Sequence, residues 1–187
     1  ERPDASYELA WHARVIANWL SHLGIPSADF VGHSFGGGVA LMLLRECPER
    51  VRRLALVAPG GLGRDVGCWL RFATTVAGVV EQFGQPFMAL GTRLALRGTP
   101  FSAEEVAERS VMNARRGTAR AFARTARDVI NWRGQSRLFL QHAYELPWLS
   151  PIAVYWGDRD ELIPMRQGAV FAQAVKGVVF KPFAGCG

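Results

Sequence analysis

Apolar residues recur every three or four positions near the start of the chain, a pattern that predicts an amphipathic helix. The helix is expected over residues 5–23, with Ser6 as its N-cap and Gly24 as the residue that ends it. A second helix is expected over residues 35–46, because an apolar run there stops just before Pro48. The apolar positions of the first helix are Leu9, Ala13, Ile16, Leu20 and Leu23.

Short apolar runs bounded by turn-forming residues predict four buried strands. They span residues 28–33, 51–58, 151–156 and 178–183. A helix pattern follows the first strand, and another, over residues 165–175, follows the third, which is typical of parallel strands joined by crossovers. The expected fold class is α/β, with about four mostly parallel strands, flanking helices and a helical insertion after the second strand.

The insertion shows no strand pattern, and its glycines and prolines divide it into helical segments. The motif Ser102-Ala103-Glu104-Glu105 is a capping box and predicts the start of one helix. Helices are expected around residues 68–83, 86–96, 103–116 and 118–132. The predicted organisation is a core part at residues 1–62, a helical cap (lid) insertion at residues 63–148 and a second core part at residues 149–187.

Two patterns inside the predicted cap have both a structural and a functional interpretation. Apolar residues at helical spacing are expected to pack in the ordinary way, the alternative being the lining of an apolar pocket: Phe72, Val76, Phe83, Phe87 and Met88. A stripe of arginines on one helix face is expected to be solvated, the alternative being a dock for an acidic substrate tail: Arg116, Arg120, Arg124 and Arg127.

The first strand leads directly into the pentapeptide Gly32-His33-Ser34-Phe35-Gly36, which has the pattern Gly-x-Ser-x-Gly. A serine on a sharp strand-to-helix turn has a strained backbone and presents its Oγ beyond the end of the sheet. Small residues two positions before and after it let the helix pass close to the strand. The Phe35 N–H at the helix start is placed to donate to an oxyanion. The pattern predicts that Ser34 is a nucleophile, the alternative being a glycine-rich turn with an incidental serine.

The composition favours a globular protein without a nucleotide or nucleic-acid partner. The formal net charge is +6 and comes almost wholly from arginine. This charge would suit an anionic partner, but an arginine-rich soluble surface is the simpler interpretation. No basic run with interleaved aromatic residues occurs, no phosphate-binding loop is present, and Gly61-Leu62-Gly63 is not a dinucleotide fingerprint. No cofactor is expected.

The cysteines predict neither a metal site nor a disulfide framework. Cys47, Cys68 and Cys186 are an odd number at unrelated spacings, as expected for reduced, mostly buried thiols in a cytoplasmic protein. The longest uncharged run, residues 30–44, is shorter than the ~18 apolar residues of a membrane-spanning helix. No membrane partner is therefore expected, and the oligomeric state is left open.

Taken in order, these elements resemble the α/β-hydrolase superfamily, and specifically its capped, esterase-like serine hydrolases. Three motifs carry the resemblance: Gly32-His33-Ser34-Phe35-Gly36-Gly37, Pro48-Glu49-Arg50-Val51, and Trp156-Gly157-Asp158-Arg159-Asp160 with Pro164. The resemblance implies that Ser34 is the nucleophile, that the Phe35 N–H is one oxyanion-hole donor and that Asp160 is the triad acid, with Asp158 as the second choice. It also implies that the chain forms the C-terminal part of the hydrolase sheet.

Two parts of the family pattern are missing from the sequence. One is the early strand-rich portion, whose His-Gly loop gives a second oxyanion donor. The other is the catalytic histidine, which follows the last strand in a Gly-x-Gly-His pattern, whereas this chain ends Gly185-Cys186-Gly187. We therefore expect an internal fragment that is inactive alone. None of the histidines present is expected to be the base: His12 and His22 are expected at the surface, His33 points away from its neighbour Ser34, and His142 lies in the cap.

The resemblance implies a Ser-His-Asp serine hydrolase that acts on a small-molecule carboxylic ester or related acyl substrate. Hydrolysis of a carbon–carbon bond in a diketone-like compound is the close alternative. A catalytically inactive binding module, or a partial product without function, is the alternative from outside the enzymes.

Overall fold

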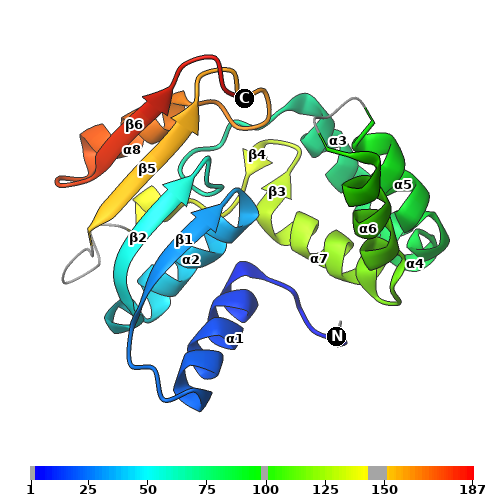
Figure 1. Cartoon of the computed structure of the whole chain (residues 1–187), viewed down its shortest axis with the longest axis horizontal. Helices are drawn as coiled ribbons and strands as arrows, with labels where there is room; N and C mark the ends of the chain where they lie inside the picture. The colour runs from blue at the N-terminus through cyan, green and yellow to red at the C-terminus, as the bar shows by residue number, and fades with distance from the viewer. Residues whose placement is uncertain (1–2, 98–100, 143–150) are drawn as a thin grey trace.

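The computed structural model describes residues 3–97, 101–142 and 151–187. At its centre lies a sheet of four parallel strands in the order β1-β2-β5-β6 (Figure 1). The strands are β1 (Ala28–His33), β2 (Val51–Val57), β5 (Ile152–Gly157) and β6 (Val179–Phe183). The parallel α/β arrangement predicted from the sequence is confirmed. Because all four strands are parallel, the turns that carry Ser34 and Asp160 both follow the carboxyl ends of their strands, at the same end of the sheet.

Helices cover one face of the sheet. Figure 1 shows α2 (Phe35–Glu46) and α8 (Arg166–Ala174) behind the strands, and α1 (Leu9–His22) packs against α2. Alternating strand residues meet these helices and form the main core. The side chains with no exposed surface in it are Leu43, Leu44, Leu56, Val154 and Phe171.

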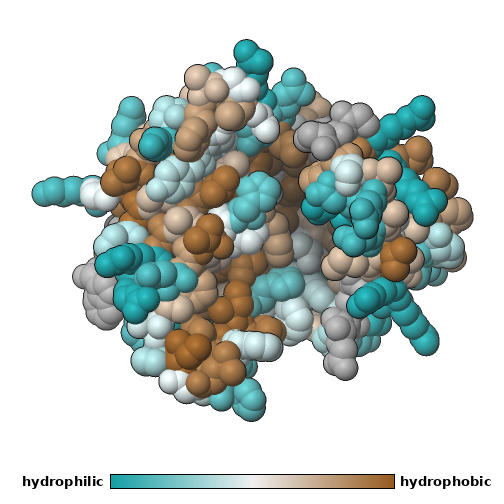
Figure 2. All heavy atoms as spheres, in the orientation of Figure 1, coloured by the Kyte–Doolittle hydropathy of each residue, from teal (hydrophilic) through white to brown (hydrophobic). Residues whose placement is uncertain are grey.

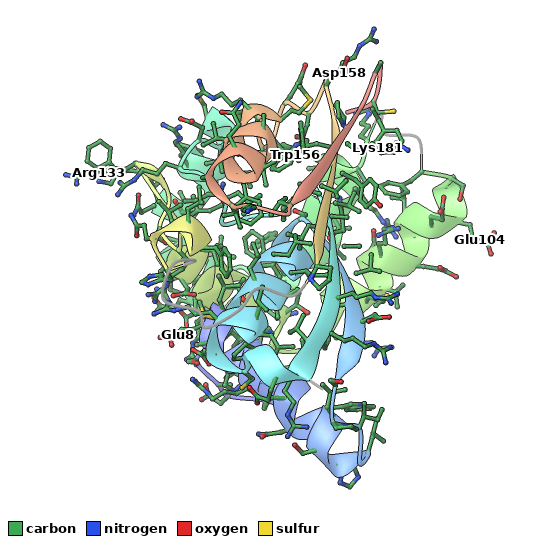
Figure 3. The ribbon with its side chains drawn as sticks, turned by 90° about the vertical axis from the view of Figure 1, so that its left-hand side faces the viewer. Glu8, Glu104, Arg133, Trp156, Asp158 and Lys181 are labelled. Carbon is green, nitrogen blue, oxygen red and sulfur yellow. The ribbon has the colours of Figure 1, made fainter. Side chains whose placement is uncertain are left out.

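The opposite face of the sheet is open in the described part of the chain. Figure 3 shows Trp156 and Lys181 on opposite sides of the sheet, with Trp156 on the covered side. Figure 2 shows apolar surface over the strands on this side. The exposed apolar residues of the four strands are Val31, Val57, Val179 and Phe183. β1 forms an edge of the sheet, so among the described residues its outer side pairs with no strand.

The insertion after β2 forms a helical layer beside the sheet (Figure 1). Its helices are α3 (Cys68–Thr75), α4 (Ala77–Phe83), α5 (Met88–Ala95), α6 (Ala103–Ala114) and α7 (Thr118–Val129). The predicted capping box is confirmed, since the Glu105 N–H donates to Ser102 Oγ and the Ser102 N–H donates to Glu105 Oε2. The helix expected over residues 68–83 is two helices that meet at Val76. The expected cap boundary at residue 148 lies outside the described residues.

The prediction of an insertion without strands is wrong. After α7 the chain forms an antiparallel hairpin of β3 (Ile130–Asn131) and β4 (Gly134–Gln135), where a helix is expected to continue to residue 132. Strands of two residues are too short to show alternation. Asn131 and Gly134 are the residues that favour a turn here. Asn131 Oδ1 accepts the Arg133 N–H, and Gly134 has a φ of +114°.

The start of α1 also differs from the prediction. The helix begins at Leu9, so Ser6 is not its N-cap, and the residue in that position, Glu8, makes no side-chain cap. The Leu9 N–H instead donates to Oδ2 of Asp128 at 2.9 Å. Asp128 belongs to α7, 119 residues along the chain. Because the two residues are so far apart in the sequence, a local sequence pattern could not predict this cap.

The stripe of four arginines is expected to be a solvated helix face, but three of the four make ion pairs. Arg124 lies 2.7 Å from both Glu81 Oε1 and Asp4 Oδ1. Arg127 also pairs with Glu81, and Arg120 pairs with Asp4. The Arg124 hydrogen bond holds the pKa of the Glu81 carboxyl below its usual range. These pairs join α7 to α4 and to the residues before α1.

The prediction that five apolar residues of the cap are packed is wrong for four of them. Phe72, Val76, Phe83 and Phe87 are exposed, and Met88 is half-buried. Cys47 is a half-buried free thiol, but Cys68 and Cys186 are exposed rather than buried. Among the described residues, no helix is both long enough and apolar enough to cross a bilayer.

Candidate active site

The turn between β1 and α2 holds Ser34 in an unusual backbone conformation. Its φ is 51° and its ψ is −119°, a combination that non-glycine residues adopt only when the surroundings impose it. The Ser34 N–H donates to Val57 O at 3.0 Å. The Ser34 carbonyl accepts from the N–H groups of Gly37, Gly38 and Gly60, at 3.0, 3.3 and 3.0 Å. Four backbone hydrogen bonds therefore fix the strained serine at the end of the sheet.

Close backbone contacts explain two of the glycines around the serine. A Cβ on Gly32 would lie 2.7 Å from Gly37 Cα, and a Cβ on Gly37 would lie 2.5 Å from Pro59 Cβ. Gly36 has no heavy atom within 4 Å of such a Cβ. The small residue that the close approach requires after the serine is thus Gly37, three positions on, and not Gly36 as the motif suggests.

Ser34 and Phe35 line a cavity of about 160 Å³ between the core and the cap. The Phe35 N–H at the start of α2 makes no hydrogen bond to any described residue, so it is free to donate to a ligand. Gln135 and Arg137 also line the cavity, and Arg137 is the one charged side chain among the lining residues. The apolar lining comes from α1, α3, the end of α7, β3, the loop before α3 and the loop after β5: Leu9, Val66, Leu70, Val129, Ile130 and Ile163.

The loop after β5 holds its two aspartates in different ways. Asp160 is half-buried and accepts three hydrogen bonds, from Trp156 Nε1 at 3.1 Å and from the N–H groups of Leu162 and Ile163 at 2.9 Å each. Ile163 also lines the Ser34 cavity. Asp158 is exposed beyond the ends of the strands (Figure 3). It accepts the Gly185 N–H at 2.8 Å, which fixes the turn after β6.

None of the four histidines lines the Ser34 cavity, and each lies within the described residues. His33 and His22 are exposed, and His142 lines a neighbouring cavity of about 230 Å³. His12 is not at the surface as expected. It is half-buried, with its ring edge-on to Phe35 at 5.2 Å between centroids. Burial lowers its pKa, and the Asp128 carboxylate opposes that shift. Its position three residues after Leu9, on the apolar side of the helix, is the sequence signal for this burial.

Two buried glutamines that the sequence analysis did not single out hold the loop behind Ser34. Gln135 Oε1 accepts the Gly61 N–H at 2.6 Å, and Gln135 Nε2 donates to Gln167 Oε1 at 3.1 Å. Gln167 Nε2 donates to the Asp65 carbonyl at 2.6 Å. Since the neighbouring Gly60 N–H binds the Ser34 carbonyl, the cap hairpin and α8 both support the serine turn. No local pattern marks these residues, because their partners lie far away in the sequence.

A buried carboxylate joins the cap to the core beside the cavity. The Asp128 side chain is 5% exposed and accepts from Arg137 Nε at 2.9 Å as well as from the Leu9 N–H. The Asp128 hydrogen bond raises the pKa of the Arg137 guanidinium, and the two side chains form an ion pair beside the cavity. In the part of the chain that the structure describes, no group of three His, Cys, Asp or Glu side chains is arranged to hold a metal ion.

Both the sheet and the serine turn are features of one family. The chain matches the family described as "alpha/beta hydrolase fold" over residues 1–187, and it belongs to that family. An uncharacterised protein of Mycobacterium tuberculosis is 32% identical over 198 residues, which cover 100% of this chain and 58% of that protein. The chain thus spans somewhat more than half the length of this relative. The 2-hydroxymuconate semialdehyde hydrolase of Pseudomonas putida is 43% identical over 74 residues, or 39% of this chain and 26% of that enzyme.

Solved structures support the same fold assignment. A thermophilic esterase from Thermogutta terrifontis superposes with a TM-score of 0.66 and 22% sequence identity. The match covers 96% of this chain and 65% of the esterase. At this identity the likeness defines the fold and not the substrate.

Proposed function

We propose that the protein is a serine hydrolase of carboxylic esters or related acyl substrates, with Ser34 as its nucleophile. The observation that carries the proposal is the strained Ser34, which lines an apolar cavity next to the unbonded Phe35 N–H. A strained serine and an unbonded N–H on neighbouring residues that line one cavity match two of the parts that acyl transfer requires, a nucleophile and an oxyanion donor.

In the proposed reaction, Ser34 Oγ attacks the acyl carbonyl while its proton passes to a histidine. The Phe35 N–H donates to the oxyanion that forms. The alcohol then leaves with the proton from the histidine, and water attacks the acyl-enzyme to release the acid and free Ser34. The proposed histidine comes from outside residues 1–187. We propose that it follows β6, as the resemblance implies. In support, the segment after β6 lies against the acid loop, since the Arg159 N–H donates to Cys186 O at 2.7 Å.

Asp160 is the proposed triad acid. Three donors fix its carboxylate in a half-buried loop, which suits a group that must orient a histidine. Asp158 has a structural explanation of its own, because it binds the turn at Gly185. The cavity of about 160 Å³ and its apolar lining favour a small acyl group.

Hydrolysis of a carbon–carbon bond is the second candidate. The similarity to the Pseudomonas putida hydrolase favours it, because that segment of 74 residues is 43% identical and 2-hydroxymuconate semialdehyde is not an ester. Both reactions would use the same nucleophile. A panel of esters and of such semialdehydes, assayed with one preparation of the complete protein, separates the two candidates.

The test is to label the complete protein with a fluorophosphonate probe and to assay a short-chain p-nitrophenyl ester. Ser34→Ala should abolish labelling and lower turnover by roughly 10⁶-fold. Asp160→Asn should lower turnover by about 10⁴-fold, and Asp158→Asn by much less. Ser27→Ala, just before β1, is the matched serine control and should leave both signals unchanged. Labelling and turnover that survive Ser34→Ala would contradict the proposal, and ligand binding without turnover would indicate an inactive binding module.

A further inference from the structure

An exposed apolar stripe runs along the outer helices of the cap. Every third or fourth residue from α3 to α5 is a large apolar side chain that is between 39% and 70% exposed. Figure 1 places α4 and α5 at the right-hand end of the molecule, away from the sheet. The members of the stripe are Phe72, Val76, Val79, Phe83, Phe87, Leu90 and Leu94.

These helices use their small and polar side chains for packing inside the cap. α4 packs on α7, where Glu81 pairs with Arg124 at 2.7 Å, and Ala77 at the start of α4 is fully buried. α5 packs on α6, where Asn113 Nδ2 donates to Thr92 Oγ1 at 2.9 Å. The fold therefore turns the apolar sides of α4 and α5 outward. Since solvent exposure of several large apolar side chains close together in the sequence is unfavourable, such a group of residues is typical of an interaction site.

The cap also carries the whole excess of positive charge. Residues 63–142 contain 12 arginines and 6 acidic residues, whereas the rest of the chain contains 10 basic and 10 acidic residues. Arg93 and Arg97 are exposed, stand three positions after Leu90 and Leu94, and form no ion pair with a described residue. Apolar side chains next to arginines suit a surface that is apolar inside and anionic outside.

We infer that the outer face of the cap docks onto an anionic lipid surface. The apolar stripe enters the boundary between headgroups and acyl chains, and the arginines bind the headgroups. A second copy of the chain fits less well, because it would bring two positively charged caps together. The sequence prediction of no membrane partner rests on the lack of a spanning run, and a helix that lies on the surface needs none. This docking goes beyond the proposed hydrolase activity, and its test measures no turnover.

The test is flotation of the 187-residue chain with large unilamellar vesicles. Vesicles of phosphatidylcholine alone are compared with vesicles that also contain phosphatidylglycerol. Binding should require phosphatidylglycerol and should fall at about 1 M NaCl, where the Debye length is about 3 Å. The double variant Phe83→Ser/Leu90→Ser should lower the partition constant about tenfold or more through the lost apolar contact. Arg93→Gln/Arg97→Gln should lower binding and weaken its salt dependence.

The matched control is Trp19→Ser, which removes an exposed aromatic side chain from α1, outside the cap. It should bind like the unaltered chain. All five replaced side chains lie on the surface, so circular dichroism should report an unchanged fold for every variant. Equal binding to both kinds of vesicle, no binding, or an equal loss with Trp19→Ser would overturn the inference. A dimer in sedimentation without lipid that Phe83→Ser/Leu90→Ser dissociates would overturn it in favour of a second copy.

Discussion

At the scale of single residues, the Ser34 turn depends on two neighbouring glycines, because a Cβ would not fit at either position. Ser34 keeps a φ of 51° because the N–H groups of Gly37, Gly38 and Gly60 converge on its carbonyl. They can do so only if α2 begins almost in contact with Pro59. The sequence correctly predicts a strained strand-to-helix turn at Ser34, but it cannot say which of three successive glycines faces Pro59. That depends on how β2 ends, and β2 ends 24 residues after β1.

The first prediction separates these glycines. Gly37→Ala should destabilise the fold by about 1–3 kcal/mol, because the new Cβ would lie 2.5 Å from Pro59 Cβ and 2.9 Å from Pro59 Cα. Gly36→Ala is the matched control. Its Cβ meets nothing within 4 Å, and alanine favours a helix over glycine, so it should be neutral or slightly stabilising. Urea unfolding of both variants measures the difference, and equal destabilisation would contradict this account of the turn.

At the scale of elements, the cap is attached to the core by side chains that act across long stretches of sequence. Asp128 at the end of α7 caps α1 and pairs with Arg137, and Gln135 on β4 binds the Gly61 N–H. The existence of α2, β1, β2 and β5 follows from apolar runs that end at turn-forming residues, since these elements are buried in the core. The start of α1 and the short hairpin do not follow, because remote partners determine both.

The second prediction measures the remote cap. Asp128→Ala should cost about 1–3 kcal/mol in unfolding free energy, because it leaves the Leu9 N–H and the Arg137 guanidinium without their partner. Asp65→Ala is the control. Its carboxylate makes an exposed ion pair with Arg166 at 2.6 Å, and exposed pairs contribute ~0–1 kcal/mol. Denaturant unfolding compares the two, and a similar cost for both would show that Asp128 acts as an ordinary surface charge.

At the scale of the whole molecule, the sequence indicates the sheet and the cap but not which of their faces are buried and which are exposed. Helical spacing at Phe72, Val76, Phe83 and Phe87 predicts buried packing, yet these side chains are exposed. Spacing identifies an apolar helix side without saying what covers it. The same limit applies to the open face of the sheet, where Val31 is 79% exposed. Periodicity alone cannot distinguish a covered face from an open one.

The last prediction concerns catalysis by residues 1–187 expressed alone. This chain should hydrolyse a p-nitrophenyl ester no faster than its own Ser34→Ala variant. None of its four histidines lines the Ser34 cavity, so the serine hydroxyl has no base. In addition, the proposed oxyanion hole would have the Phe35 N–H as its single donor from residues 1–187, and the loss of a second such donor costs about 10²–10³-fold in turnover. Turnover that depends on Ser34 would contradict this reasoning. His142→Ala and His12→Ala in the same chain would then identify the base, since these histidines line the neighbouring cavity and pack on Phe35, respectively.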